Sequence, residues 1–308
     1  MNAGRKIRLK SAMVEAARWS RLPTLLAPSF AGVGAIIAMH RVREASDDEF
    51  QPNLTLEITP AFLDRTISHI KELDLDIVSL DDMLRRLQTG DFDRRFVCLT
   101  LDDGYADNYI HGYPIFRAHQ VPFSIYLTTG FLDGDALFWW LLLEEVIRRN
   151  DRISLNIEGK QEALPTARLA EKERAFELLQ ARFRGLSAKA VEAASLALAS
   201  DHGIDPAAFC REHAMTWDMA RGITVDGLGT IEAHTEKHLA LSLQTENEIR
   251  AEMDSSCARI AEKTGRSPRH FAYPFGDVQA VTRREIDLVR KLSPASATTT
   301  RAGILKPQ

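Results

Sequence analysis

The sequence predicts an α/β fold with a mainly parallel sheet, either wound or closed into a barrel. Short apolar runs typical of strands alternate with segments of helical periodicity over residues 34–135 and again from residue 229 onward. Strands that alternate with helices pair in parallel, because each helix returns the chain to the same edge of the sheet. With 308 residues, the chain is long enough for one large barrel or two ordinary domains.

Composition is that of a globular protein with a sizeable core, since 45% of residues are hydrophobic and 27% are charged. The net charge of −4 gives no electrostatic footprint for nucleic acid, so we expect no nucleic-acid partner. The three cysteines, Cys98, Cys210 and Cys257, have no metal-ligand spacing. An odd number of scattered cysteines is typical of a reducing compartment.

The first 32 residues are predicted to form a basic helical segment. Six lysines and arginines precede a mostly apolar run from Leu22 to Met39, a pattern that resembles a signal peptide or a membrane anchor. However, Pro23 and Pro28 interrupt the run, and it is short for a membrane span. We therefore favour a basic amphipathic helix followed by a strand, and a cytoplasmic protein. Weak contact of this basic segment with an anionic membrane surface is the alternative.

The expected elements of the first part follow in order. Strands are expected at 34–39, 76–80, 96–99 and 122–127, and helices from Pro60, after Ser79 or Asp81, and over about 106–120. Thr59 can cap the first helix, where proline suits the first helical position. Gly90 is expected to end the second helix.

The pattern changes between residues 136 and 221, where the chain is mostly of helical character. We interpret this stretch as a helical insertion into a single α/β domain formed by residues 33–135 and 222–308. The aromatic run Phe138–Trp140 is expected in the core of the insertion, with a substrate cleft as the alternative.

The α/β pattern then resumes with a strand at Gly229–Ala233 and a helix over about 245–265. In this helix Ile249 is expected to face the core, whereas Glu248 and Glu252 are expected on the exposed face. A strand at Arg269–Tyr273, a helix over 280–292 and a weak strand at 295–299 complete the chain.

Two adjacent carboxylates end the buried strand that begins at Phe96. Period-2 geometry points Asp102 and Asp103 to different sides, and Gly104 allows a sharp turn directly after them. One carboxylate could bind a metal while the other faces a substrate. On these residues alone, a surface turn in which both aspartates cap backbone N–H groups is an equal alternative. Their place at the carboxyl end of a strand favours a site.

Two histidines form the second informative motif, because His234 and His238 follow the strand at Gly229–Ala233. At this spacing they fall on one face of a helical turn, from which both imidazoles can reach one ion. One aspartate and two histidines form a three-ligand set that leaves a position open for water, as a catalytic metal site requires.

The segments Thr100–Gly104, His234–His238 and Arg269–Gly276 together resemble, in order, the first three motifs of the polysaccharide deacetylases of carbohydrate esterase family 4. Weaker similarity extends along Met39–Val42 and Leu56–Gly130. The resemblance implies a distorted (β/α) barrel with fewer than eight strands and a divalent metal ion, with zinc the expected one. It also implies a carbohydrate substrate.

By position, the resemblance implies a role for each matched residue. Asp102 corresponds to the catalytic base, and Asp103, His234 and His238 correspond to the metal ligands. Tyr273 occupies the position whose backbone N–H helps to bind the oxyanion. Substrate-binding positions in the cleft or beside the ligands are implied for the remaining matched residues, Thr235, Pro274 and Gly276.

Three departures from the family pattern stand out. Ala272 replaces an arginine that often pairs with the base, and Arg269 is the candidate substitute. Glu232 replaces the usual glycine two residues before His234, where it either crowds the site or supports it. No Leu-His motif supplying the general acid is found near the C-terminus, so His40, at the end of the first strand, is the reserve candidate.

The function predicted from this resemblance is metal-dependent removal of N-acetyl groups from an amino-sugar oligomer, polysaccharide or glycolipid. Deformylation or another amide hydrolysis on the same scaffold is a close variant. A non-catalytic sugar-binding or assembly protein is the alternative of a different class. The missing acid and Ala272 favour the alternative, whereas the intact aspartate pair favours the enzyme.

Overall fold

A computed structural model describes residues 32–157 and 159–307 of the chain. Its main sheet has seven strands, and β5 pairs with β1, β4 and β6 while the order continues through β9 and β10 to β11. The strands are β1 (Gly34–Met39), β4 (Asp76–Ile77), β5 (Phe96–Leu101), β6 (Phe123–Leu127), β9 (Gly229–Ala233), β10 (His270–Ala272) and β11 (Ser296–Thr298). Every pairing among them is parallel.

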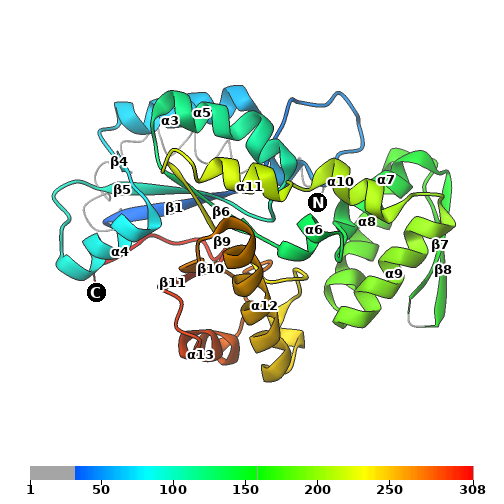
Figure 1. The fold of residues 1–308 in the computed structure, drawn as a ribbon. Helices are drawn as coiled ribbons and strands as arrows, with labels where there is room; N and C mark the ends of the chain where they lie inside the picture. Colours follow the sequence, from blue (N-terminus) through cyan, green and yellow to red (C-terminus); the bar gives the residue numbers. More distant parts are fainter. Residues whose placement is uncertain (1–31, 158, 308) are drawn as a thin grey trace.

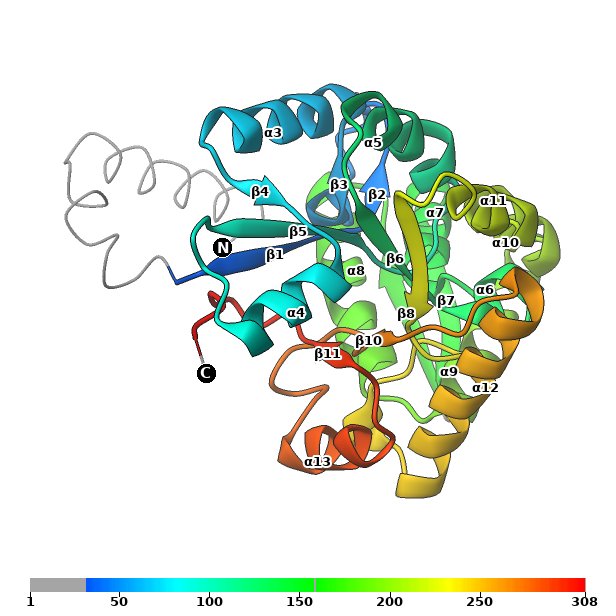
Figure 2. The ribbon, with the colours of Figure 1, turned by 60° about the vertical axis from the view of Figure 1, so that its left-hand side comes forward.

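The sheet curls into an open, distorted barrel with helices around its outer side, which confirms the predicted α/β fold (Figure 2). The outer helices are α3 (Pro60–Glu72), α4 (Leu80–Thr89), α5 (Tyr113–His119), α11 (Trp217–Ile223), α12 (Glu246–Thr264) and α13 (Arg283–Lys291). Shorter elements are β2 (Arg41–Val42), β3 (Glu57–Ile58), α6 (Thr129–Asp133) and the turns η1 (Leu54–Leu56), η2 (Asn108–Gly112) and η3 (Leu241–Leu243).

Helix starts follow the capping residues in the sequence. The Thr59 side chain accepts a hydrogen bond from the backbone of Phe62, and Ser79 does the same for Asp82. Gly90 ends α4 in the left-handed conformation. The helix predicted over 106–120 is present at residues 106–119, and its residues Asn108–Gly112 form a π-helical turn, η2, that continues into α5.

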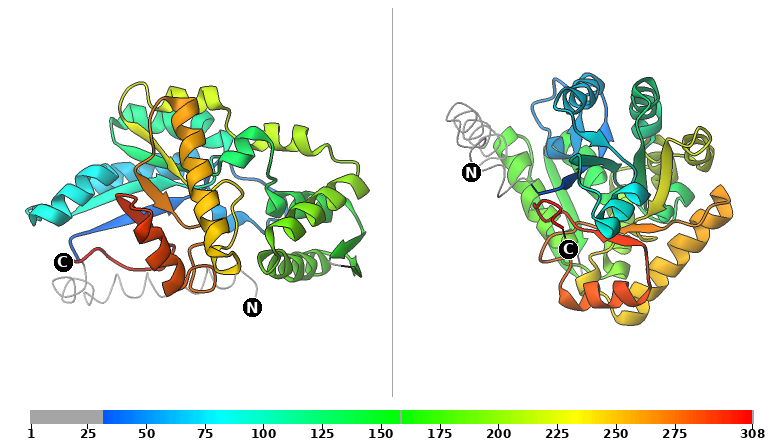
Figure 3. Two further views of the ribbon diagram at one scale, coloured as in Figure 1. Left: turned by 60° about the horizontal axis from the view of Figure 1, so that its bottom comes forward. Right: turned by 90° about the vertical axis from the view of Figure 1, so that its left-hand side faces the viewer.

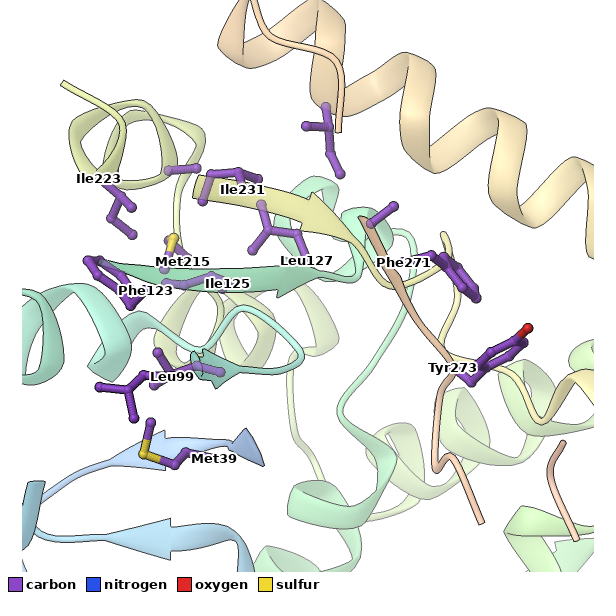
Figure 4. Packing of buried hydrophobic residues seen from close by; sticks show 14 of the residues in the cluster. Met39, Leu99, Phe123, Ile125, Leu127, Met215, Ile223, Ile231, Phe271 and Tyr273 are labelled. Atoms are coloured by element: carbon purple, nitrogen blue, oxygen red, sulfur yellow. The ribbon is translucent and has the colours of Figure 1, made fainter. Parts of the chain in front are cut away.

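A continuous hydrophobic core fills the space between the sheet and its helices. Figure 4 shows side chains from neighbouring strands meeting in this core, among them Leu99 of β5, Ile125 of β6 and Ile231 of β9. Because all main strands run parallel, their carboxyl ends meet at one edge. The residues just after β1, β5, β9 and β10, namely His40, Asp102, His234 and Tyr273, therefore lie close together.

The insertion forms a separate lobe beside the carboxyl edge of the sheet (Figures 1 and 3). It contains α7 (Trp139–Arg149), α8 (Leu169–Arg184), α9 (Ala188–Asp201) and α10 (Pro206–His213). It also contains an antiparallel hairpin of β7 (Arg152–Ile157) and β8 (Lys160–Pro165), which the helical prediction missed. The sequence carried the signal, since Ile153, Leu155 and Ile157 alternate with exposed residues at the period of a strand.

The insertion has a hydrophobic cluster of its own that reaches under the carboxyl edge of the sheet. Phe138 stacks on Tyr105, with ring centroids 4.9 Å apart, and on Phe131, at 3.9 Å. The aromatic run at 138–140 is therefore core, as predicted.

The predicted basic N-terminal helix lies outside the described residues, as does the membrane contact predicted through it. Among the helices that the structure describes, none combines the length and the apolar character needed to cross a membrane.

Candidate active site

The aspartate pair lies directly after β5. The backbone N–H of Asp102 donates to the carbonyl of Met39 at 2.9 Å, which holds the pair at the carboxyl edge beside β1. Asp103 has a left-handed backbone with φ of 73°, a conformation that aspartate tolerates better than most residues. Gly104 follows with φ of 84°, and a Cβ there would come within 2.5 Å of the Leu127 side chain. The sharp turn predicted from Gly104 is confirmed.

The histidine pair does not lie on a helical turn, so that prediction is wrong. His234 follows β9, and the segment to His238 is a loop in which Thr235 and His238 have φ of 66° and 54°. The Thr235 hydroxyl accepts the backbone N–H of His238 at 3.0 Å. This tight turn, and not helical spacing, places the two imidazole rings 5.1 Å apart.

Glu252 supports the same loop from below, although it was predicted to be exposed. Only 9% of the residue is exposed, and its Oε2 accepts the backbone N–H groups of Glu236 at 3.0 Å and Lys237 at 2.9 Å. The spacing in the sequence could have indicated this burial. Glu252 follows the buried Ile249 by three residues and directly precedes the buried Met253, so all three lie on one face of α12.

Asp103, His234 and His238 converge on one point. Oδ1 of Asp103 lies 3.4 Å from Nε2 of His234 and 3.1 Å from Nε2 of His238. Ligands bound tetrahedrally to zinc at about 2.1 Å lie roughly 3.4 Å from one another, close to these separations. Oδ1 of Asp103 is buried without a hydrogen-bond partner. Nδ1 of His234 lies 2.8 Å from the carbonyl of Ala272, a contact that leaves Nε2 free for an ion.

The donor set therefore fits a divalent metal ion. The three side chains are buried, and their ligand atoms all lie within 4.8 Å of one another. One carboxylate and two imidazoles are typical zinc ligands, and three protein ligands leave a coordination position open.

Burial and neighbouring charges shift the pKa values of the two aspartates in opposite directions. Burial raises the pKa of Asp102, and the neighbouring carboxylate of Asp103 adds to the rise against the opposing effect of the histidines. Burial also opposes ionisation of Asp103, but the charge of His238 and the nearby imidazole nitrogens of both histidines hold its pKa well below the usual range. Asp102 is therefore the more readily protonated of the two carboxylates.

A pocket of about 280 Å³ opens above these residues. Asp102, Asp103, His234 and His238 line it together with His40 and Tyr273. The pocket thus joins the aspartate pair, the histidine pair and the reserve candidate His40, which come from the ends of three different strands.

Two predicted roles are contradicted by the hydrogen bonds. The backbone N–H of Tyr273 donates to the carbonyl of Thr298 at 3.1 Å as part of the sheet, so it is not free to bind an oxyanion. Arg269 does not reach Asp102, because its guanidinium pairs with Asp81 at 2.5 Å and is 62% exposed.

The remaining matched residues lie beside the pocket and not in its lining. Thr235 shapes the histidine loop, and Pro274 and Gly276 form the turn after β10. A Cβ at Gly276 would meet the backbone nitrogen of Thr300 at 2.5 Å, so this position needs glycine for backbone packing.

Glu232 does not crowd the site. Its Oε2 accepts the backbone N–H groups of Arg269 at 2.7 Å and His270 at 2.8 Å, which ties β9 to the start of β10. His270 is held within the sheet, since its ring lies 2.8 Å from the Ser296 hydroxyl and 3.2 Å from Asp81.

The insertion brings further residues to the pocket. Trp139 and Trp140 of α7, for which a substrate cleft was the alternative prediction, line it together with Gln180 and Arg184 of α8, which sequence reasoning missed. The aromatic run is therefore both core and lining. The spacing of Gln180 and Arg184 places them on one helix face, but nothing in the sequence indicates which element that face meets.

Comparison with known proteins finds similarity to the family that the sequence motifs resemble. The model of a family described as polysaccharide deacetylase matches residues 186–290, which include both histidines and Tyr273 but not the aspartate pair. No protein of curated function matches the sequence.

Several solved structures share the fold. The deacetylase PplD of Streptococcus pyogenes, in complex with acetate, is 16% identical with a TM-score of 0.57, over 88% of this chain and 85% of that one. A de-N-acetylase from Aggregatibacter actinomycetemcomitans is 16% identical with a TM-score of 0.56, over 89% and 90%. IcaB from Ammonifex degensii is 15% identical with a TM-score of 0.56, over 89% and 86%. Residues 186–290 thus match the polysaccharide deacetylase family, and the chain shares its fold with solved deacetylases, in agreement with the resemblance seen in the sequence.

Proposed function

We propose that the protein is a metal-dependent hydrolase that removes N-acetyl groups from an amino-sugar oligomer, polysaccharide or glycolipid. One observation supports this most directly. A buried Asp/His/His cluster shares one pocket with a second carboxylate, Asp102, that is outside the cluster and has a raised pKa. A structural metal site needs no such neighbour, whereas hydrolysis needs a base beside the ion.

Asp103, His234 and His238 would hold the ion, with zinc as the expected metal. When bound, the ion would supply Lewis-acid polarisation of the acetamide carbonyl and of a water molecule. Asp102 accepts the proton of the attacking water, and its raised pKa makes it a stronger base than an ordinary aspartate. The Ala272 carbonyl orients His234 throughout.

Among the described residues that line the pocket, His40 is our candidate donor of the proton for the departing amine. His40 follows Met39, whose register partner in the sheet is Leu101, so His40 lines the pocket beside Asp102. We propose His40 as general acid, the role that the family assigns to a C-terminal histidine.

A non-catalytic sugar-binding protein is the second candidate. It is favoured by the sheet hydrogen bond of the Tyr273 N–H, which removes the expected oxyanion donor. Deformylation would use the same residues, and only the substrate distinguishes it from deacetylation.

Acetate release from N-acetylated amino-sugar oligomers by the zinc-loaded protein tests the proposal. We expect release by the wild type and a loss of about 10³-fold or more in Asp102→Asn, since that variant removes the base. Metal analysis runs beside it, with Asp103→Ala and His234→Ala as probes of the ligands. Bound metal without release from any oligomer would favour the binding protein, and release of formate from formylated sugars alone would favour deformylation.

A further inference from the structure

A second cavity lies where the insertion meets the loop that bears both histidines. It has a volume of about 350 Å³, and its walls come from Gly134–Leu137, which joins α6 to α7, from α9, and from Glu236 and Lys237 of the histidine loop. Of the described residues, only Trp139 lines both this cavity and the pocket above the aspartate pair. The Trp139 ring stacks on Phe183 with centroids 5.1 Å apart. Trp139 therefore separates two distinct cavities.

Most of the lining of the second cavity is apolar. Leu137, Val191 of α9 and Leu239 contribute to it, and Leu196, which is 45% exposed, lies at its edge. The volume leaves room for roughly ten non-hydrogen atoms, if each takes about 30 Å³, the share of one water molecule in the liquid. A mostly apolar cavity of this size with a few placed polar groups is typical of a site for a small molecule.

One hydroxyl in the lining has no partner. Ser195 of α9 is 2% exposed, and its Oγ makes no hydrogen bond to any residue that the structure describes. A serine within a helix can satisfy its hydroxyl on the backbone carbonyl one turn earlier, but Ser195 does not. A buried hydroxyl without a partner is unfavourable, so a ligand that donates a hydrogen bond to it would be stabilised there.

Carboxylates dominate the charged part of the lining. Asp135, Glu192 and Glu236 line the cavity against one cation, Lys237, and no other charged residue in the described part of the chain does. Nζ of Lys237 lies 3.7 Å from Oε2 of Glu192, so these two charges offset each other. The side chains of Asp135 and Glu236 have no ion-pair partner among the described residues. The cavity therefore has an excess of negative charge.

The backbone of Glu236 is held on both sides of the cavity wall. Its N–H donates to Oε2 of Glu252 at 3.0 Å, and its carbonyl accepts the N–H of Gly130 at 2.8 Å. A Cβ at Gly130 would come within 2.5 Å of this carbonyl oxygen, so the contact requires glycine. Because the wall is already ordered, a ligand would need to order few further groups on binding.

We propose that this cavity binds a small organic cation, namely an ammonium group carried on an apolar body. The apolar body would lie against Leu137, Val191 and Leu239. The Ser195 hydroxyl would accept an N–H of the ammonium group, and the carboxylates of Asp135 and Glu236 would offset its charge. The site is independent of the proposed function, since apart from Trp139 its lining residues do not line the pocket above the aspartate pair.

Titration of the zinc-loaded protein with hexylammonium, followed by NMR chemical shifts at pH 7, tests the proposal. At this pH the amine is protonated, as a lysine side chain is. Hexan-1-ol and hexanoate have the same length with a neutral and a negative end, and both should bind at least about tenfold more weakly. Glucosamine, an ammonium ion with a polar body, should also bind at least about tenfold more weakly, because the apolar lining leaves its hydroxyls without partners.

Two variants remove the polar groups of the site. Ser195→Ala should weaken hexylammonium binding by about tenfold, as expected for loss of a hydrogen bond to a charged group. The double variant Asp135→Asn/Glu236→Gln should also weaken it by about tenfold, since two partly exposed charges are lost. Neither variant should change the affinity for hexan-1-ol by as much. Glu246→Gln, at an exposed position outside the lining, is the control for loss of charge and should bind as the wild type does.

Filling the cavity locates the site. Ala188→Phe places a large side chain in the lining from the first turn of α9 and should abolish binding, whereas Ala193→Phe, at an exposed position of the same helix outside the lining, should not. Unchanged hexylammonium affinity in Ala188→Phe, or in both Ser195→Ala and the double variant, would overturn the assignment of the site. Equal affinity for hexan-1-ol or hexanoate would overturn the ammonium group, and equal affinity for glucosamine would overturn the apolar body.

Discussion

Oε2 of Glu252 lies 2.9 Å from the backbone nitrogen of Lys237, the residue directly before His238. The same oxygen holds the N–H of Glu236, so one carboxylate from α12 fixes the middle of the loop that bears both histidines. Burial raises the pKa of Glu252, and the two N–H groups offset part of that rise. The metal site therefore depends on a residue that contacts neither the ion nor the pocket.

Replacing Glu252 with alanine should lower zinc affinity by about 10- to 100-fold, the range typical of residues that support metal ligands. The loop would lose its two anchoring hydrogen bonds and leave both N–H groups without a partner. Competition with a zinc chelator measures the change. Glu252→Gln keeps a carbonyl oxygen and should retain most of the affinity, and Asp254→Ala, at an exposed position two residues on, should have no effect. Unchanged affinity in Glu252→Ala would contradict this.

Tyr105→Phe tests how the insertion is attached beneath the site. The indole N–H of Trp140 donates to the Tyr105 hydroxyl at 2.8 Å, and both residues are buried. Removing the hydroxyl leaves the indole N–H unpaired, which should lower the free energy of unfolding by about 1–3 kcal/mol. Urea denaturation measures this. Tyr109→Phe is the control, because its hydroxyl makes no hydrogen bond to any described residue. A loss in Tyr105→Phe no larger than in the control would refute the attachment.

Parallel pairing of the strands and the paired motifs could be predicted from the sequence because both follow from local rules. Alternating elements imply parallel pairing, and parallel pairing brings the ends of β1, β5 and β9 together. Asp102 and His234, more than a hundred residues apart, could therefore be expected in one site. The hydrogen-bond partners could not be expected, since the register that ties the Tyr273 N–H to Thr298 depends on where β11 lies.

The side chains that the insertion contributes to the pocket were harder still to predict from the sequence. Gln180 and Arg184 belong to a helix whose sequence shows only that it is amphipathic. Their contact with the barrel depends on the docking of a whole lobe, and no local pattern encodes that docking. For Arg269, in contrast, the sequence suggested a place at the site that the structure does not give it. Its proximity in sequence to the third motif suggested a role at the site, but the strand directs its side chain to Asp81.

Asp107→Ala should destabilise the edge of the sheet that presents His40. Its carboxylate accepts from the Arg41 side chain at 2.9 Å and from the backbone of Val42 at 3.0 Å. Arg41 is 7% exposed, and its other carboxylate partner, Glu57, is 3.7 Å away. A buried charge that loses its partner typically costs about 3–5 kcal/mol of unfolding free energy.

Chemical denaturation of Asp107→Ala measures that cost. Asp107→Asn, which keeps an acceptor for Val42, should lose less. Asp47→Ala, at an exposed position without a hydrogen bond to the described residues, should change the unfolding free energy by less than about 0.5 kcal/mol. Equal stability of Asp107→Ala and the wild type would show that Arg41 finds another partner.

Asp133 should make the stability of the protein depend on pH. It ends α6 and accepts from the indole of Trp217 at 2.8 Å and from Arg259 of α12 at 2.7 and 2.8 Å. Burial opposes ionisation, but Arg259 and Trp217 outweigh it and lower the pKa of Asp133 in the folded state. A lowered folded-state pKa means that the stabilisation is complete above the unfolded-state value of about 3.9 and is lost as pH falls through the folded-state value.

Asp133→Asn should therefore cost about 1–2 kcal/mol of unfolding free energy at pH 7, and the difference from wild type should shrink as the pH is lowered from 4 to 3. Urea denaturation across this range measures the difference directly. Asp135→Asn, two residues away and exposed, should give a small difference that does not vary with pH. A cost of Asp133→Asn that is the same at pH 7 and pH 3 would mean that the amide replaces the carboxylate fully, and that charge contributes nothing to the junction between α6, α11 and α12.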